Sequence, residues 1–235
     1  MSNSNTAEQV LCELQSLGNP TPANIAGMQR FGIHFTTTYC VSVPALRKYA
    51  KKLKNNHALA LSLWESDVHE AKLLATMIDD PAKVTEGQME RWVKDFDSWD
   101  ICDQCCGNLF DKTPFAYEMA IQWSTHDKEY IKRAGFVLMA TLAVHDKKAE
   151  DMKFTLFFPS IELEAYDDRN FVKKAVNWAL RQIGKRNNRL HKQAITVAET
   201  IQSQGTPSAR WIAADALREL QSAPVIARVN RNGKE

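Results

Sequence analysis

Four segments of this 235-residue chain superimpose without gaps, and this repetition limits the possible folds more than any other feature of the sequence. Each segment has an apolar residue, two mostly charged positions and a small or apolar residue, a spacing that indicates one face of a helix. The segments are residues 67–75, 130–138, 171–179 and 208–216. Equivalent positions in the last three, Ala134, Ala175 and Ile212, are 41 and 37 residues apart. These separations are close to the period of about 40 to 47 residues in paired-helix repeats of the HEAT type.

Helix boundaries can be recognised elsewhere in the chain. Helices are predicted to end at Gly18 and at Gly32, and another is predicted to begin at Ser42 with Pro44 in its first turn. The β-prone segment 35–39 has no second strand with which to pair, so we predict a loop there.

Two further helices are predicted between the repeats, over residues 115–123 and 189–201. Since no convincing strand is present, the sequence predicts an all-α fold, a HEAT/armadillo-like α-solenoid of paired helices with a concave basic groove. We expect residues 1–235 to form a single domain of this kind, in which residues 228–235 are a flexible basic tail.

The chain is long enough to bury a proper core. No apolar run approaches the roughly 20 residues that span a bilayer. The first 18 residues are too polar for a signal peptide. We therefore expect a cytoplasmic protein that has no membrane partner.

The sequence has five cysteines, and three of them, Cys102, Cys105 and Cys106, lie close together. An odd number of crowded cysteines argues against a disulfide framework. Their CxxCC spacing suggests a metal site, but zinc needs a second pair of ligands, and the chain has no other CxxC and no HxxxH. We therefore expect buried, reduced cysteines, with no metal and no cofactor.

The net charge of +2 hides an asymmetry, because residues 170–235 contain 12 Lys and Arg against 4 Asp and Glu. The repeat alignment places cations at equivalent positions of three successive helices, namely Lys132, Arg133, Lys173, Lys174 and Arg210. Such a basic stripe suggests a polyanion partner. In the alternative interpretation these cations only solvate outer helix faces, and Arg228, Arg231 and Lys234 form only a solvated tail.

The segment 96–103 combines aromatic and acidic residues beside a predicted helix start. If Asp97 or Ser98 caps this helix, Trp99 and Asp103 are an i, i+4 pair whose side chains point the same way. Asp100 then lies in the first turn and is expected to act as a capping or helix-dipole residue. Asp103 lies beyond that turn among mostly apolar neighbours, either at a surface-facing edge or in a functional site.

Three segments resemble, in order and approximate spacing, the functional segments of the AlkD-like DNA alkylation repair proteins. They are residues 99–103 (WDICD), 130–134 (YIKRA) and 174–181 (KAVNWALR), and the similarity covers most of the chain from Tyr39 onwards. The resemblance implies HEAT-like repeats and a DNA glycosylase of base excision repair. Members of this kind release positively charged N3- and N7-alkylated purines from duplex DNA, so the implied partner is double-stranded DNA that contains such lesions. We expect a monomer.

The resemblance also implies roles for individual residues. Asp103 matches the family's catalytic aspartate, whereas Trp99 and Trp178 match its two lesion-side aromatics. Arg133 matches its backbone-binding arginine. The remaining cations would hold further phosphates, and these are Lys132, Lys173, Lys174, Arg181 and Arg210.

One carboxylate could suffice for this chemistry. Sugar hydrolysis ordinarily needs an acid for the leaving group and a second carboxylate. An alkylated purine already carries a positive charge and is a good leaving group unaided. Asp103 would then stabilise the cationic sugar or orient water, and the faces of Trp99 and Trp178 would attract the cationic base.

The sequence departs from the family pattern in two places. We find no counterpart of the family's N-terminal aromatic contact, and the stretch between Arg133 and Trp178 is longer by several residues around 154–159. Core packing is an alternative role for both tryptophans. The alternative functions are a catalytically inactive DNA-structure binder of the same family and a protein-binding HEAT-repeat scaffold.

Overall fold

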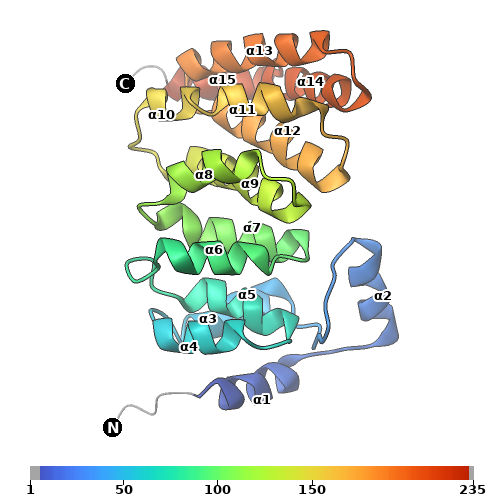
Figure 1. Cartoon of the computed structure of the whole chain (residues 1–235), viewed down its shortest axis with the longest axis vertical. Helices are drawn as coiled ribbons and strands as arrows, with labels where there is room; N and C mark the ends of the chain where they lie inside the picture. Colours follow the sequence, from blue (N-terminus) through green and yellow to red (C-terminus); the bar gives the residue numbers. More distant parts are fainter. Residues whose placement is uncertain (1–5, 233–235) are drawn as a thin grey trace. The chain divides into compact units, whose positions relative to one another are not determined.

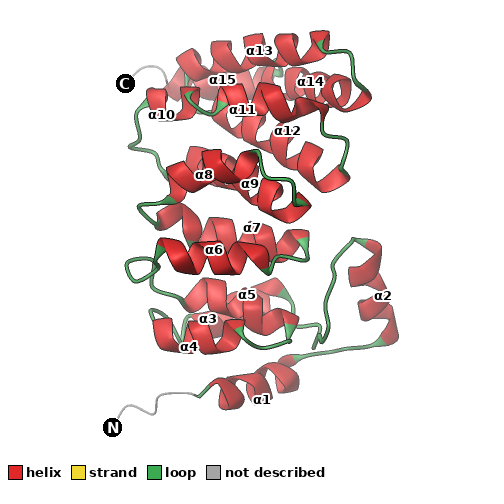
Figure 2. Ribbon diagram, viewed as in Figure 1, coloured by secondary structure: helices red, strands yellow, loops and turns green. Residues whose placement is uncertain are grey.

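Helices and the loops between them make up the chain in the computed structural model, which describes residues 6–232 (Figures 1 and 2). The only strand-like feature in that range is an isolated bridge between Thr37 and Val68. The chain divides into two compact units, residues 1–113 and 114–235. The predicted all-α architecture is therefore confirmed. None of the described helices is both long and apolar enough to cross a bilayer.

The first unit consists of short helices, most of which begin at a recognisable cap. They are α1 (Ala7–Leu17), α2 (Pro22–Arg30), α3 (Val43–Ala50), α4 (His57–Trp64), α5 (His69–Ile78), α6 (Glu86–Lys94), α7 (Trp99–Asn108) and the 3-10 helix η1 (Phe110–Lys112). The side chains of Thr21 and Ser42 accept hydrogen bonds from backbone N–H groups of the first turns of α2 and α3. A proline follows each cap, where its missing N–H costs nothing.

The core of this unit is built around two stacked indoles. The rings of Trp64 in α4 and Trp92 in α6 are parallel, with centroids 3.9 Å apart. Trp64 Nε1 donates a 3.0 Å hydrogen bond to Asp95, so the buried N–H is satisfied.

Helix α2 stands apart from α3 to α5 in Figure 1 and is joined to them by long connections. The following loop is held by one buried carboxylate, Glu70 of α5. Glu70 accepts hydrogen bonds from the Thr38 hydroxyl at 2.7 Å and from the N–H groups of Tyr39 and Val41 at 3.0 and 3.2 Å. The loop predicted at 35–39 is confirmed, since a side chain satisfies backbone groups that a strand would pair with a neighbour.

The second unit contains the longest helices. They are α8 (Ala116–Ser124), α9 (Glu129–His145), α10 (Asp151–Thr155), α11 (Phe158–Leu163), the 3-10 helix η2 (Glu164–Tyr166), α12 (Asn170–Gly184), α13 (Asn188–Ser203), α14 (Pro207–Leu220) and α15 (Ala223–Asn232). The last three aligned segments fall in α9, α12 and α14, and α12 packs against both of the others. Helices α8 and α13 pack on α9 and α14 as their partners. A Cβ at Gly135 would lie 2.5 Å from the Ser124 nitrogen, so α8 and α9 cross closely there.

The end of the chain differs from the expected flexible tail. Residues 228–232 belong to α15, which buries Val225 and Val229. These two valines are four residues apart and lie on one helix face, whereas the arginines between and after them reach solvent. Residues 233–235 lie outside the described range.

Candidate functional site

Helix α7 begins at Trp99, with Ser98 at the N-cap, and thereby brings Trp99 and Asp103 to the same side one turn apart. Both residues are partly exposed. Three other tryptophans, Trp64, Trp92 and Trp123, are only 2% exposed and belong to the core. Trp99 is therefore less buried than the core tryptophans, and it lies beside a carboxylate on the same helix.

A third group, Phe31, adjoins Trp99. The indole Nε1 of Trp99 donates a 2.9 Å hydrogen bond to the carbonyl oxygen of Phe31, which ends α2. The Phe31 side chain is 65% exposed, and the Arg30 guanidinium carbon lies 5.3 Å from its ring centroid. Sequence reasoning missed Phe31, because 68 residues separate it from Trp99. The one available signal was a large aromatic residue just before the helix-ending Gly32.

Asp100 links α7 to α5. One carboxylate oxygen lies 2.8 Å from His69 Nε2, and the other accepts from the Ser98 hydroxyl at 2.5 Å and the Ile101 N–H at 3.0 Å. Burial disfavours the ionised form, but these hydrogen bonds outweigh it and lower the pKa of Asp100. Asp100 lies in the first turn of α7, the position expected for a helix-dipole residue. The partner His69, which aligns α7 on α5, was not expected.

A cavity of about 450 Å³ lies between α2 and the α5 to α7 region. His69, Glu70 and Asp100 line it on one side, and Gly27 and Met28 of α2 line the other. The polar groups that fix the loop and α7 therefore share one wall of this cavity.

Helix α7 also carries the crowded cysteines. Cys102, Cys105 and Cys106 are all fully buried, and burial raises the pKa of the Cys105 and Cys106 thiols. Within residues 6–232 no three His, Cys, Asp or Glu side chains come together as a metal site. Cys105 and Cys106 therefore pack as neutral thiols.

In the second unit, Trp178 of α12 is also partly exposed. With the Gln182 amide oriented so that its oxygen faces donors, that oxygen accepts from Trp178 Nε1 at 3.0 Å and from Lys185 Nζ at 3.2 Å. Trp178 is thus held by a residue one turn along its own helix.

The cations on α9 do not lie as expected. Lys132 is only 5% exposed, and its amine pairs with Glu164 and, at 3.2 Å, with Asp167. Burial disfavours the charged amine, but the hydrogen bonds to both carboxylates outweigh it and raise its pKa. The phosphate contact expected for Lys132 stays a prediction, and in the structure its amine is buried against two carboxylates instead. Arg133 is 6% exposed and donates a 2.6 Å hydrogen bond to the Phe171 carbonyl.

The cations of α12 and α14 are more varied. Lys174 and Arg210 are exposed, and Lys173 places its amine 5.5 Å from the ring centroid of Trp211, which is 41% exposed. Arg181 instead pairs with Glu219 and lies 3.7 Å from Asp215. Of the proposed stripe, Lys173, Lys174 and Arg210 are therefore the groups that remain available to a ligand.

The comparisons with known proteins agree with this architecture. A family model described as DNA alkylation repair enzyme matches residues 10–220. Two uncharacterised proteins, Lin0241 of Listeria innocua and Lmo0209 of Listeria monocytogenes, are 24% and 25% identical over 200 residues. Each alignment covers 83% of this chain and 86% of the relative.

A solved structure gives the corresponding likeness in three dimensions. It represents a new family related to the HEAT-like repeat DNA glycosylases with affinity for branched DNA structures. The two chains superimpose with a TM-score of 0.75 at 20% identity, covering 92% of this chain and 95% of the other. This similarity confirms the HEAT-like repeat fold. Because the family model spans most of the sequence, the chain belongs to the DNA alkylation repair enzyme family.

Proposed function

We propose that the protein is a DNA glycosylase that releases positively charged N3- and N7-alkylated purines from duplex DNA in the cytoplasm. The observation that carries this proposal is the side-by-side placement of Trp99 and Asp103 on α7, both partly exposed, with Phe31 adjacent. An aromatic face attracts a cationic base, and a neighbouring carboxylate suits the positive charge that develops on the sugar.

The remaining residues are proposed to bind rather than react. Trp178 is the second proposed aromatic contact. Lys173, Lys174 and Arg210 are the proposed phosphate contacts, and such contacts supply affinity and orientation but little sequence discrimination. A repair enzyme that must act in any sequence context needs this kind of binding.

The decisive variant is Asp103→Asn, which is nearly isosteric and removes the negative charge. Base release from duplex DNA that contains 7-methylguanine should fall by on the order of 10² to 10³ in rate, with folding and DNA affinity retained. Asp97→Asn is the matched control, because Asp97 is exposed, precedes the same helix and loses the same charge. If Asp103→Asn releases the base as fast as Asp97→Asn, Asp103 is not catalytic.

A catalytically inactive binder of DNA structures is the second candidate. It is favoured by the solved relative, which belongs to a family with affinity for branched DNA. The same assay separates the two candidates. Wild-type protein that binds branched or duplex DNA but releases no base supports the binder, whereas an absence of salt-dependent DNA affinity supports a protein-binding scaffold.

A further inference from the structure

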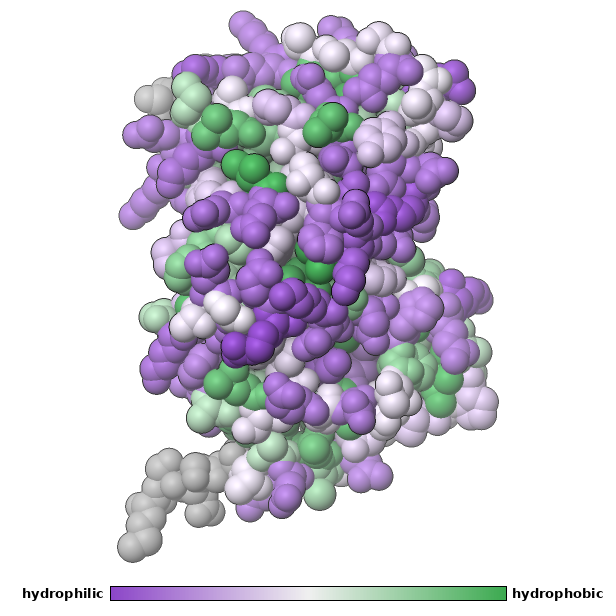
Figure 3. All heavy atoms as spheres, in the orientation of Figure 1, coloured by the Kyte–Doolittle hydropathy of each residue, from purple (hydrophilic) through white to green (hydrophobic). Residues whose placement is uncertain are grey.

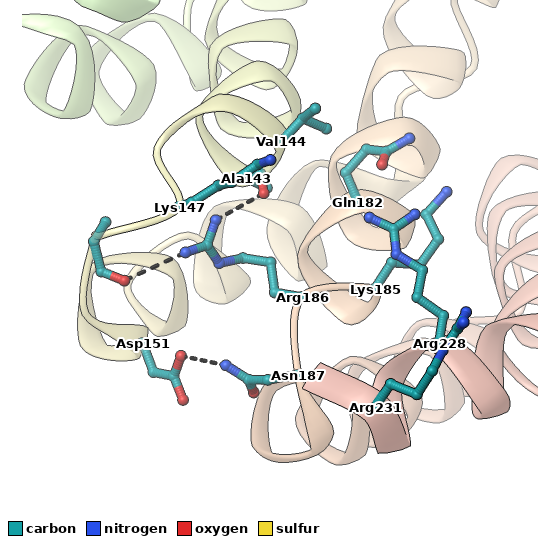
Figure 4. Close-up of a pocket in the computed structure, with 11 residues that line it drawn as sticks. Ala143, Val144, Lys147, Asp151, Gln182, Lys185, Arg186, Asn187, Arg228 and Arg231 are labelled. Carbon is teal, nitrogen blue, oxygen red and sulfur yellow. Dashed lines mark hydrogen bonds between the residues drawn. The ribbon is translucent and has the colours of Figure 1, made fainter. Parts of the chain in front are cut away.

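A second cavity, of about 490 Å³, lies in the second unit, at the carboxyl ends of α9 and α12 and beside α15 (Figure 4). It lies about 15 Å along α12 from Lys174, since ten residues separate Lys174 from Gly184 at 1.5 Å per residue. None of the residues proposed to act on the lesion lines it. Its lining is rich in cations, which are Lys147, Lys185, Arg186, Arg228 and Arg231.

Two of these cations have structural partners. Arg186 donates to the carbonyl oxygens of Ala143 at 2.7 Å and Ala149 at 3.3 Å, and thereby ties the end of α9 to the following loop. Its guanidinium also lies 3.9 Å from the ring centroid of Phe154. Lys185 places its amine 2.6 Å from Glu219. These contacts hold the wall of the cavity.

The other three cations lack such partners. Lys147, Arg228 and Arg231 are exposed and form no ion pair with any described residue. Figure 4 shows Arg228 and Arg231 extending from α15 on the same side as Lys185 and Gln182, with Lys147 on another wall. The one carboxylate in the lining, Asp151, already accepts a 2.7 Å hydrogen bond from the Asn187 amide. The cavity therefore gathers positive charges from three separate segments, with little opposing charge.

We propose that this cavity binds a phosphate group. Arg and Lys side chains that converge on one space from different elements suit a multiply charged oxyanion, because each charge-assisted hydrogen bond can reach a different oxygen. The ordinary explanation, cations near helix carboxyl ends that neutralise the dipole, accounts for Arg186 and Lys185. Arg231 lies in the last turn of α15 and can neutralise that dipole as well, but dipole neutralisation does not require Arg228 and Arg231 to line a cavity at the ends of α9 and α12.

The phosphate could be free or part of the DNA backbone, and the test uses one probe for each source. Inorganic pyrophosphate is titrated into the full chain by calorimetry, and a duplex is titrated at several salt concentrations. The variants are Arg228→Glu/Arg231→Glu and, on a different wall, Lys147→Glu. These side chains are exposed, whereas Val225 and Val229 hold α15 to the unit, so folding should be retained.

The matched control is Arg91→Glu/Lys94→Glu. These two exposed cations have the same three-residue spacing at the end of α6, so charge change and helix-dipole cost are equal. Pyrophosphate affinity should fall by about tenfold or more in both cavity variants and stay unchanged in the control. Equal affinity in cavity and control variants, or no binding by wild type of either probe at this cavity, overturns the proposal.

The duplex titration shows whether the bound phosphate belongs to the DNA backbone or to a free compound. If the backbone occupies the cavity, Arg228→Glu/Arg231→Glu flattens the slope of log affinity against log salt by about one to two phosphate contacts. An unchanged slope together with lost pyrophosphate binding supports a free phosphate compound instead. Neither readout depends on base release, so a protein without glycosylase activity leaves this test intact.

Discussion

Helices α7 and α12 carry the same local arrangement but secure it differently. Each presents a partly exposed tryptophan followed one turn later by a polar residue, Asp103 in α7 and Gln182 in α12. The Trp178 indole is bound by Gln182 of its own helix, whereas the Trp99 indole is bound by Phe31, 68 residues earlier. The setting of Trp178 is therefore encoded locally. The setting of Trp99 depends on α2.

The two helices also differ in the side-chain contacts that join them to adjacent helices. Helix α7 is tied to α5 by the buried pair of His69 and Asp100. Helix α12 is tied to α14 by partly exposed ion pairs of Arg181 with Glu219 and Asp215 and by a neutral hydrogen bond, in which the Asn177 amide donates to the Ile212 carbonyl at 3.0 Å. A substitution in the first unit should therefore disturb the site at a distance, while the second unit should tolerate a comparable loss.

The largest effect is expected for His69→Ala. It leaves the mostly buried Asp100 carboxylate without its imidazole partner, although Ser98 and Ile101 still bond to it, so stability should fall by about 2 kcal/mol. Urea unfolding measures this loss. His34→Ala is the control, since His34 is exposed in the same unit and should cost under about 0.5 kcal/mol. Equal unfolding midpoints for both variants would contradict the role of His69.

A smaller effect is expected for Phe31→Ala, and it should fall on function rather than stability. The exposed ring contributes little to the core, and the carbonyl that binds Trp99 remains. If Phe31 stacks on DNA bases, affinity for duplex that contains a lesion should drop roughly fivefold, the equivalent of about 1 kcal/mol. Leu17→Ala removes a similarly exposed side chain (51%) from the same unit and should leave affinity unchanged. A drop of the same size in both variants would remove Phe31 from the site.

Acid should weaken the contact that ties α7 to α5. The pKa of Asp100 is lowered in the folded protein, so the ionised carboxylate stabilises the fold above its unfolded value of about 3.9. That contribution disappears as the pH falls through the lower folded pKa. The stability gap between wild type and Asp100→Asn should be constant from pH 7 to 5 and shrink below about pH 4. A gap that does not change down to pH 2 would show that Asp100 does not contribute in this way.

The smallest effect is expected for Gln182→Ala. Trp178 is partly exposed, so water can replace the lost acceptor and stability should change by less than about 0.5 kcal/mol. Thermal unfolding is the measurement. A loss as large as that of His69→Ala would mean that α12 depends on its tryptophan contact as strongly as α7 depends on α5, and the contrast between the helices would fail.

Local patterns in the sequence were sufficient for most of the fold. The apolar spacing predicted α9, α12 and α14, and a cap at Asp97 or Ser98 predicted the start of α7, because these signals act within one or two turns. The contacts of Phe31 and His69 could not be predicted, since they join residues distant in the chain. Lys132 shows a further limit of sequence-based prediction. A charge pattern gives the position of a lysine along the helix but does not show whether its amine reaches solvent or pairs with a buried carboxylate such as Glu164.

The secondary structure of segments without a clear apolar pattern is also difficult to predict from sequence. Residues 228–235 look like a solvated basic tail in sequence, but residues 228–232 lie in α15, where Val229 is buried. The stretch noted around 154–159 forms the end of α10 and the start of α11, and Leu156 in it is exposed (58%). Leu163, further along α11, is also exposed (60%). Figure 3 shows hydrophobic patches over these helices.

The burial of three of the five cysteines has a practical consequence for chemical labelling. A maleimide reacts with a thiol that is both accessible and deprotonated. Cys105 and Cys106 meet neither condition, because they are fully buried and burial raises the pKa of both thiols. Cys12 on α1 is exposed, and Cys40 is intermediate. Under brief, dilute conditions a fluorophore should therefore attach first to Cys12, giving a dye on the first helix of the native sequence without any engineered cysteine.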